Sequence, residues 1–253
     1  MELGGYELTV ISILGLIQLC YFIIGGYIGL RAKKTSQKGV YFLSLQIIFL
    51  GISMISEILG IILSIQFIGY TTGIIPMIFA LLFVQKVFYS EKKSPVKKIF
   101  PIFAVVLIIN LVIFSLQFVN QAVGLSIYNI YGKLTMAALA LLAYSFEIYA
   151  PIKEWTKIRA LNIENHVKTR YWLFGISQIA YTITTLTFYA VDPTQGGENP
   201  VVFVLTIITF AIMGFYVFGT YLTWFMPDWF KKLLNGPEQE IEEELSEEEI
   251  MEG

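Results

Sequence analysis

Two ionisable residues, Glu57 and Lys133, lie inside long apolar stretches of the 253-residue chain. A charged side chain at the centre of a membrane helix costs about 2.5–3.5 kcal/mol on insertion scales, so such a residue needs a partner or a function. If both stretches are membrane helices, each residue lies about 9 Å inside the same boundary. We therefore predict that Glu57 and Lys133 meet. Three roles stay open for them: a structural ion pair, a ligand or substrate pocket, and a proton relay.

Other polar residues recur along the apolar stretches at helical spacing, so that they share faces of the expected helices. We expect these faces to point inward, where hydroxyls and amides join helices or line a pocket. Glu147 follows the same face as Lys133, but near the inner boundary, where we expect its carboxylate to reach water. The predicted lining residues are Gln46, Ser53, Asn129, Tyr144, Gln178, Thr182, Thr185, Tyr189, Thr206, Thr209 and Tyr216.

The stretches that carry these residues are long enough to be transmembrane helices. Hydrophobic residues make up 56% of the chain and charged residues 14%, against about 25% charged in a typical soluble domain. A soluble protein of this size could not bury so much apolar surface in one core. The sequence predicts an all-α polytopic membrane protein, a seven-helix bundle over residues 1–226. The predicted spans are 8–30, 40–63, 68–88, 100–118, 127–149, 171–191 and 201–225.

Glycine and proline add detail to two of the spans. Pro76 follows Gly73 by about one turn, which predicts a kink in the third span and makes Pro76 a candidate hinge. Gly15 and Gly25 flank Gln18 in the first span. Because glycines let a neighbouring helix approach closely, we expect a close contact there.

The distribution of basic residues predicts the orientation. Of the 17 Lys and Arg residues, all except Lys133 fall on the same side of the predicted spans. The other side carries Glu2, Glu7, Asp192 and Glu198 in its loops. By the positive-inside rule, the N-terminus lies outside and the C-terminus in the cytoplasm. We expect a multi-pass protein of the cell membrane, with the lipid bilayer as its first partner.

The C-terminal segment predicts two further parts. Residues 227–236 form an expected interfacial helix, with Asp228 as its N-cap, Gly236 as its stop and one apolar face made of Trp229, Phe230, Leu233 and Leu234. Residues 237–253 are rich in Glu and read as an acidic cytoplasmic tail, either solvated or docking a basic partner. With the inner loop predicted at 150–170, this tail is the candidate contact for a cytoplasmic signalling partner.

Several classes of function are excluded by what the sequence lacks. No His, Cys, Asp and Glu cluster has metal-ligand spacing, and no catalytic constellation or phosphate loop appears. Cys20 is the one cysteine, so no disulfide framework is expected. The last predicted span has no lysine to carry a retinal Schiff base. We expect neither an enzyme nor a nucleic-acid binder, and no cofactor.

The layout resembles the seven-helix N-terminal sensor region of prokaryotic histidine kinases. The resemblance rests on the predicted orientation, the short outer loops and the stretch HVKTRYWLFG at 166–175 that leads into the sixth span. The closing stretch from Trp224 to Trp229 is also similar to the end of uncharacterised archaeal seven-helix proteins. The resemblance implies a membrane sensor. Because no kinase domain follows Gly236, it also implies a separate cytoplasmic partner.

Two alternatives stay open beside this receptor-like interpretation. A small-solute transporter of the 3+1+3 type has the same orientation, and Tyr41-Phe42-Leu43 and Tyr171-Trp172-Leu173 open corresponding spans. The Pro-Gln dipeptide typical of sugar-transporting proteins of this type is absent from the sequence. The third alternative is a non-catalytic membrane scaffold subunit. A homo-oligomer is compatible with all three.

Overall fold

The computed structural model describes residues 5–63, 68–89, 94–119, 133–190 and 199–235, and this part of the chain is helical. Seven helices of 20 residues or more run through it. In chain order the elements are α1 (Gly5–Lys34), α2 (Lys38–Leu63), α3 (Ile68–Val87), the short 3-10 helix η1 (Pro95–Lys98), α4 (Phe100–Val119), α6 (Lys133–Ile158), α7 (Asn165–Ala190), α8 (Pro200–Phe225) and α9 (Asp228–Asn235).

Each of the seven predicted spans falls on one of these long helices, and the all-α prediction is confirmed for the described residues. Four helical segments are long and apolar enough to cross a membrane: Leu8–Lys34, Lys38–Ser56, Leu134–Ile158 and Pro200–Phe225. Large apolar side chains such as Leu16, Leu30 and Val201 are exposed on the outside of the bundle. An exposed apolar surface of this kind suits lipid rather than water. Seven crossings and their orientation stay predictions.

The predicted inner loop at 150–170 is wrong as a loop. The helix α6 continues through Pro151 to Ile158, and α7 begins at Asn165, so the connection is 159–164. The apolar stretch ends earlier than the helix because backbone hydrogen bonding does not depend on side-chain polarity. Helix α3 also continues beyond the position of a predicted kink, since the buried Pro76 lies inside it. A hinge at Pro76 stays a prediction.

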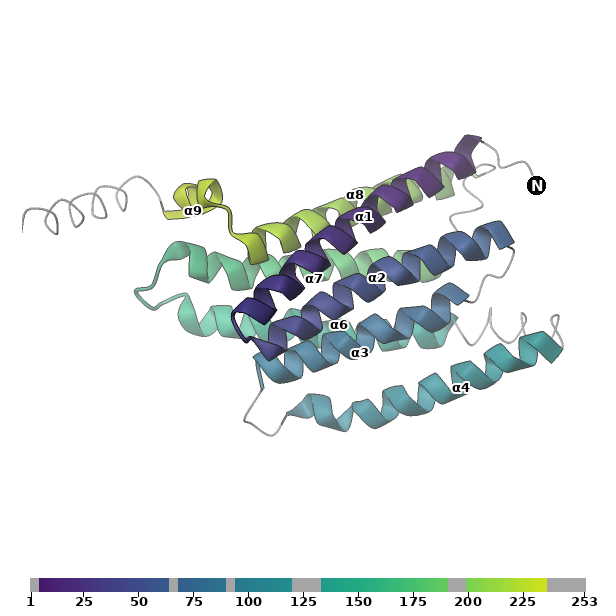
Figure 1. Ribbon diagram of the computed structural model, residues 1–253, viewed down its shortest axis with the longest axis horizontal. Helices are drawn as coiled ribbons and strands as arrows, with labels where there is room; N and C mark the ends of the chain where they lie inside the picture. Colours follow the sequence, from purple (N-terminus) through teal and green to yellow (C-terminus); the bar gives the residue numbers. More distant parts are fainter. Residues whose placement is uncertain (1–4, 64–67, 90–93, 120–132, 191–198, 236–253) are drawn as a thin grey trace, which may run out of the picture.

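Six of the helices form a closed ring in which each contacts the next: α1, α2, α3, α6, α7 and α8, with α8 returning to α1. Helix α4 packs against α3 and η1 on the outside of this ring (Figure 1). Successive long helices run in opposite directions, so the end of α1, the start of α2 and the end of α3 lie at one end, to the left in Figure 1. We call it the basic end, because Arg31, Lys86 and Arg170 lie there.

Helices α1 and α2 pack closely at Gly25. The hydroxyl Oγ of Ser44 donates a buried hydrogen bond to the carbonyl of Gly25 over 2.7 Å. A Cβ atom added at Gly25 would lie 2.8 Å from Ile48 Cγ1 and 3.2 Å from the Ile48 backbone nitrogen. The close approach predicted at Gly25 is therefore confirmed. The one predicted at Gly15 is wrong, since nothing lies within 4 Å of a Cβ there.

The short helix α9 lies within the predicted segment 227–236, and its place at the membrane surface stays a prediction. Its residues Trp229 and Leu233 are exposed, as an apolar face at a membrane surface requires. The predicted cap is wrong: the backbone N–H groups of Phe230 and Lys231 bond the carbonyl of Pro227, and Asp228 stands in the first turn. Asn235 Oδ1 accepts a hydrogen bond from the backbone N–H of His166 over 3.3 Å, which docks α9 against the start of α7.

The α1–α2 contact generates a stability prediction. Gly25→Ala should lower the free energy of unfolding by about 1–3 kcal/mol, the usual cost of overpacking, because the new methyl group meets the Ile48 backbone. Gly26→Ala is the matched control, since nothing lies within 4 Å of a Cβ at Gly26. It should leave stability unchanged or raise it slightly. Unfolding of the detergent-solubilised protein measures both, and equal effects of the two variants would contradict the packing described.

Candidate functional site

Glu147 is fully buried in the middle of the helix ring. It lies on α6 about 17 Å from the end of that helix at Ile158, given the rise per helical residue. The prediction that its carboxylate reaches water is therefore wrong. The prediction assumed that the helix ends at 149, whereas the two further turns carry the carboxylate deep into the bundle.

The one hydrogen bond described for the Glu147 side chain comes from Gln46 on α2. Gln46 Nε2 donates to Glu147 Oε2 over 2.9 Å, and both residues are 0% exposed. The two residues are far apart in the sequence, so the bond is a tertiary contact that joins α2 to α6 across the interior of the ring. None of the ion pairs among the described residues gives Glu147 a positive partner.

Further polar atoms gather around this pair from the other helices. Tyr216 on α8 is within electrostatic reach of Glu147, and its hydroxyl lies beside Gln178 of α7 and Thr220 of α8. Together with Gln46 and Glu147 we call these residues the polar centre. Within the described part of the chain, several of its buried atoms have no hydrogen-bond partner: Gln46 Oε1, Glu147 Oε1, both amide atoms of Gln178, Tyr216 Oη and Thr220 Oγ1.

Three further tyrosines extend the polar centre around the ring. The ring centroids of Tyr144 and Tyr181 are 4.9 Å apart, those of Tyr181 and Tyr216 are 4.6 Å apart, and those of Tyr216 and Tyr21 are 6.0 Å apart. These contacts link α6, α7, α8 and α1 through aromatic edges and faces, which pack favourably at such distances. A chain of phenol groups therefore lines the interior next to the carboxyl group of Glu147.

A cavity of about 60 Å³ adjoins the tyrosines on the side away from the basic end. Its polar lining includes Ser53, Tyr144, Tyr181, Thr184 and Thr185. Pockets for organic ligands measure about 300–1,000 Å³. This cavity suits water or a small ion instead, because one water needs only about 10–15 Å³ of such space.

The predicted inward faces are largely confirmed. Thr185 is half-buried, and the other predicted lining residues whose side chains the structure describes are buried: Gln46, Ser53, Tyr144, Gln178, Thr182, Thr206, Thr209 and Tyr216. Asn129 lies outside the described residues, as do the side chains of Glu57, Lys133 and Tyr189. The predicted ion pair of Glu57 and Lys133 therefore stays a prediction.

The sequence predicts threonine hydroxyls that join neighbouring helices or line a pocket, but their described hydrogen bonds stay within their own helices. The hydroxyls of Thr182, Thr185, Thr206 and Thr209 each donate to the carbonyl four residues earlier in their own helix. A hydroxyl bonded to its own backbone is satisfied without a partner helix. These threonines therefore add little to the polar centre.

Sequence reasoning missed Tyr21 and Tyr181 as parts of the site and misplaced Glu147. An aromatic residue in a membrane helix carries no signal of its direction. The position of Glu147 on the Lys133–Tyr144 face did carry such a signal, and the expected span boundary overrode it. No group of three or more His, Cys, Asp or Glu suited to a metal ion occurs among the described residues.

Comparison of the chain with protein families, with curated proteins and with solved structures finds no match.

The bond between Gln46 and Glu147 generates the second prediction. Gln46→Leu should lower the free energy of unfolding by about 1–3 kcal/mol, because it leaves a buried carboxyl group without its donor. Adding Glu147→Leu should recover much of this loss, since an apolar pair of similar volume replaces a polar pair. The double-mutant cycle should then show a coupling of about 0.5–3 kcal/mol.

Unfolding of the four proteins in one detergent measures this coupling. Gln18→Leu is the control for Gln46→Leu, because it removes a half-buried amide from α1 away from Glu147. Combined with Glu147→Leu, it should behave additively. Additive behaviour of Gln46→Leu with Glu147→Leu would mean that the two side chains do not interact.

Proposed function

We propose that this chain is an integral membrane sensor of the receptor-like type, in which the polar centre is the part that responds. One observation carries the proposal: a fully buried glutamate, bonded to a glutamine of another helix, stands among polar atoms that have no partner in the described residues. Ionisable residues in membrane interiors are costly and usually functional. A structural pair would leave fewer polar atoms unsatisfied.

The orientation belongs to the same proposal. The basic end faces the cytoplasm, because the positive-inside rule places Lys and Arg of short loops there. The cavity next to Tyr144 then faces the outer half of the membrane. Multi-pass insertion into the cell membrane follows from the same orientation.

Two levels of contact between α2 and α6 form the proposed switch. The inner level is the bond between Gln46 and Glu147. The outer level is the proposed pair of Glu57 and Lys133, which lie about 17 Å and 21 Å further along the same two helices. A small ion, a proton or another ligand that binds one arrangement of α2 and α6 better than another shifts the population between them.

The helices α6 and α8 would carry this change to the basic end. Helix α6 continues from Glu147 to Ile158, and α8 carries both Tyr216 and, about 12 Å further on, Trp224. A cytoplasmic partner that binds residues 150–170 and the acidic tail would respond to this change. The resemblance to histidine-kinase sensor regions supports this direction of coupling, and a homo-oligomer is compatible with it.

A transporter is the second candidate function, and one observation favours it. Helices α1–α3 and α6–α8 close the ring, while α4 lies outside it against α3. A 3+1+3 transporter needs such a linking helix between its two halves. Alternating access to the interior would distinguish this function from a sensor, and a scaffold would show no access at all.

Thiol accessibility tests these alternatives in a Cys20→Ala background. Ser53→Cys places a thiol in the small cavity, and a membrane-impermeant reagent is applied to each side of oriented vesicles. We expect slow labelling from the outer side alone, because the polar centre closes the route from the basic end. Lys157→Cys, exposed at the basic end, is the orientation control and should react only from the other side.

Labelling of Ser53→Cys from both sides would replace the sensor proposal by the transporter. Absence of labelling in the folded protein would favour the third alternative, a non-catalytic scaffold subunit.

Coupling between the polar centre and the basic end is tested separately. Thr223→Cys is buried beside Trp224, so its reaction with a thiol reagent reports opening of the basic end. Glu147→Gln should change its rate about fivefold or more, the effect of a coupling free energy of about 1 kcal/mol. The control Glu164→Gln removes an exposed carboxylate that pairs with His166 and should leave the rate unchanged. An unchanged rate in Glu147→Gln would show that no coupling exists.

A further inference from the structure

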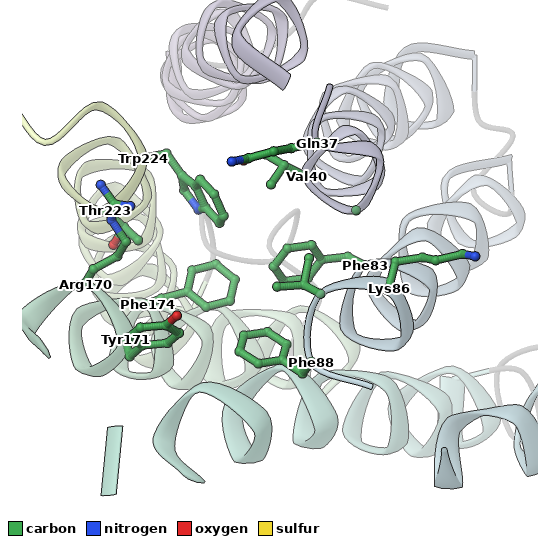
Figure 2. A pocket seen from close by; sticks show the side chains of 12 residues that line it. Gln37, Val40, Phe83, Lys86, Phe88, Arg170, Tyr171, Phe174, Thr223 and Trp224 are labelled. Carbon is green, nitrogen blue, oxygen red and sulfur yellow. The ribbon is translucent and has the colours of Figure 1, made fainter. Parts of the chain in front are cut away.

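A second cavity, of about 370 Å³, opens at the basic end. It lies between the start of α2, the end of α3 and the facing ends of α7 and α8. Figure 2 shows Gln37 and Trp224 on one side of it and the rings of Phe83, Phe88 and Phe174 on the other. Its volume is that of a site for a small organic molecule or a lipid head group.

Two hydrogen-bond donors without a partner in the part of the chain that the structure describes belong to the polar lining of this cavity. Arg170 Nε and Trp224 Nε1 are buried, and neither has a hydrogen-bond partner among the described residues. The guanidinium of Arg31 lies near that of Arg170, and its Nη1 donates to the carbonyl of Trp224 over 2.7 Å. None of the ion pairs within the described ranges includes Arg31, Lys86 or Arg170.

The positive charge of Arg170 is repelled by that of Arg31, which lies next to the cavity. Arg170 precedes the predicted span 171–191, and the pKa of its guanidinium is lowered, first by burial and then by the like charge of Arg31. Two neighbouring guanidinium groups without a counter-ion raise the free energy of the site. An anion that binds there relieves the repulsion and supplies acceptors for the N–H donors. Guanidinium groups match phosphate and carboxylate oxygens especially well.

Much of the remaining lining is apolar and aromatic, and the indole ring of Trp224 packs within it. The ring centroids of Phe83 and Phe174 lie 5.6 Å apart, and each lies about 6 Å from that of Trp224. A free inorganic anion gains nothing from such a lining. An amphiphile does, because its charged group meets the donors while its apolar part covers the phenyl rings.

We infer that this cavity binds the phosphate head group of an anionic membrane lipid, with Arg170 and Trp224 as its donors and the aromatic lining against the lipid backbone. The position fits the proposed orientation, on which this step rests, since anionic lipids collect in the cytoplasmic leaflet and bind basic pockets between helices. The inference goes beyond the sensor proposal, because it requires neither Glu147 nor any conformational coupling. A soluble phosphate compound shares the head-group chemistry, and the experiment separates the two sources.

The test is binding of phosphatidylglycerol to the purified full chain in detergent, read as retained lipid in native mass spectrometry and as a shift in melting temperature. Phosphatidylglycerol should bind and raise the melting temperature, and phosphatidylcholine should do neither. Arg170→Gln should weaken phosphatidylglycerol binding about tenfold or more, the effect of losing a charged hydrogen bond. Trp224→Phe keeps the ring, removes the N–H and should weaken binding about threefold to tenfold.

Arg159→Gln is the matched control. Arg159 is an exposed arginine near the same end that stacks on Trp155 and does not line the cavity. It should leave the affinity within about twofold, as exposed charges usually do. Trp224→Phe keeps the test decisive if Arg170→Gln does not fold.

Three results would overturn the inference. Equal binding of phosphatidylcholine would show that the head-group charge is not recognised. Equal weakening by Arg159→Gln and Arg170→Gln would show that binding follows overall charge rather than this cavity. Protection by inorganic phosphate or glycerol 3-phosphate that equals that of the lipid at the same concentration would assign the site to a soluble phosphate compound.

Discussion

A buried carboxyl group in an apolar helix ring imposes the strictest constraint on this structure. Glu147 is fully buried on α6, and its carboxyl group accepts a hydrogen bond from Gln46 of α2. The two helices must therefore keep a rotation and a depth at which the two side chains meet. Apolar packing alone would set neither, because a leucine surface packs on another at many registers. The bond thus holds two sides of the ring in one arrangement.

The other polar groups of the interior divide into two kinds. The threonines of α7 and α8 bond carbonyls of their own helices and need nothing from their neighbours. The atoms around Glu147 differ, since Gln178, Thr220 and Tyr216 keep unused donors and acceptors within the described part of the chain. This difference separates buried polarity that serves packing from buried polarity that is available to a ligand, a proton or water. It explains why the centre of the ring, rather than the longest hydroxyl stripe, is the candidate site.

Helix α8 connects the polar centre to the basic end. Tyr216 faces the polar centre, and Trp224 lies on the same helix at the wall of the larger cavity. A rotation or shift of α8 would affect both places, because a helix transmits motion along its length as a stiff body. The closed ring has no comparable path through α4, which packs on the outside against α3.

The sequence by itself determined the helices and their inward faces. Apolar stretches of membrane length form helices because every backbone group must be bonded within its own segment, and polar residues at helical spacing turned inward, as Gln46, Gln178 and Tyr216 show. Only the tertiary structure decided which faces meet. The bond from Gln46 to Glu147, the tyrosine chain and the donor-lined cavity each combine residues from separate helices. Helical periodicity gives a direction around one axis, and it contains no information about the neighbour that lies in that direction. The length of α6 was also missed, because a helix does not end where its side chains become polar.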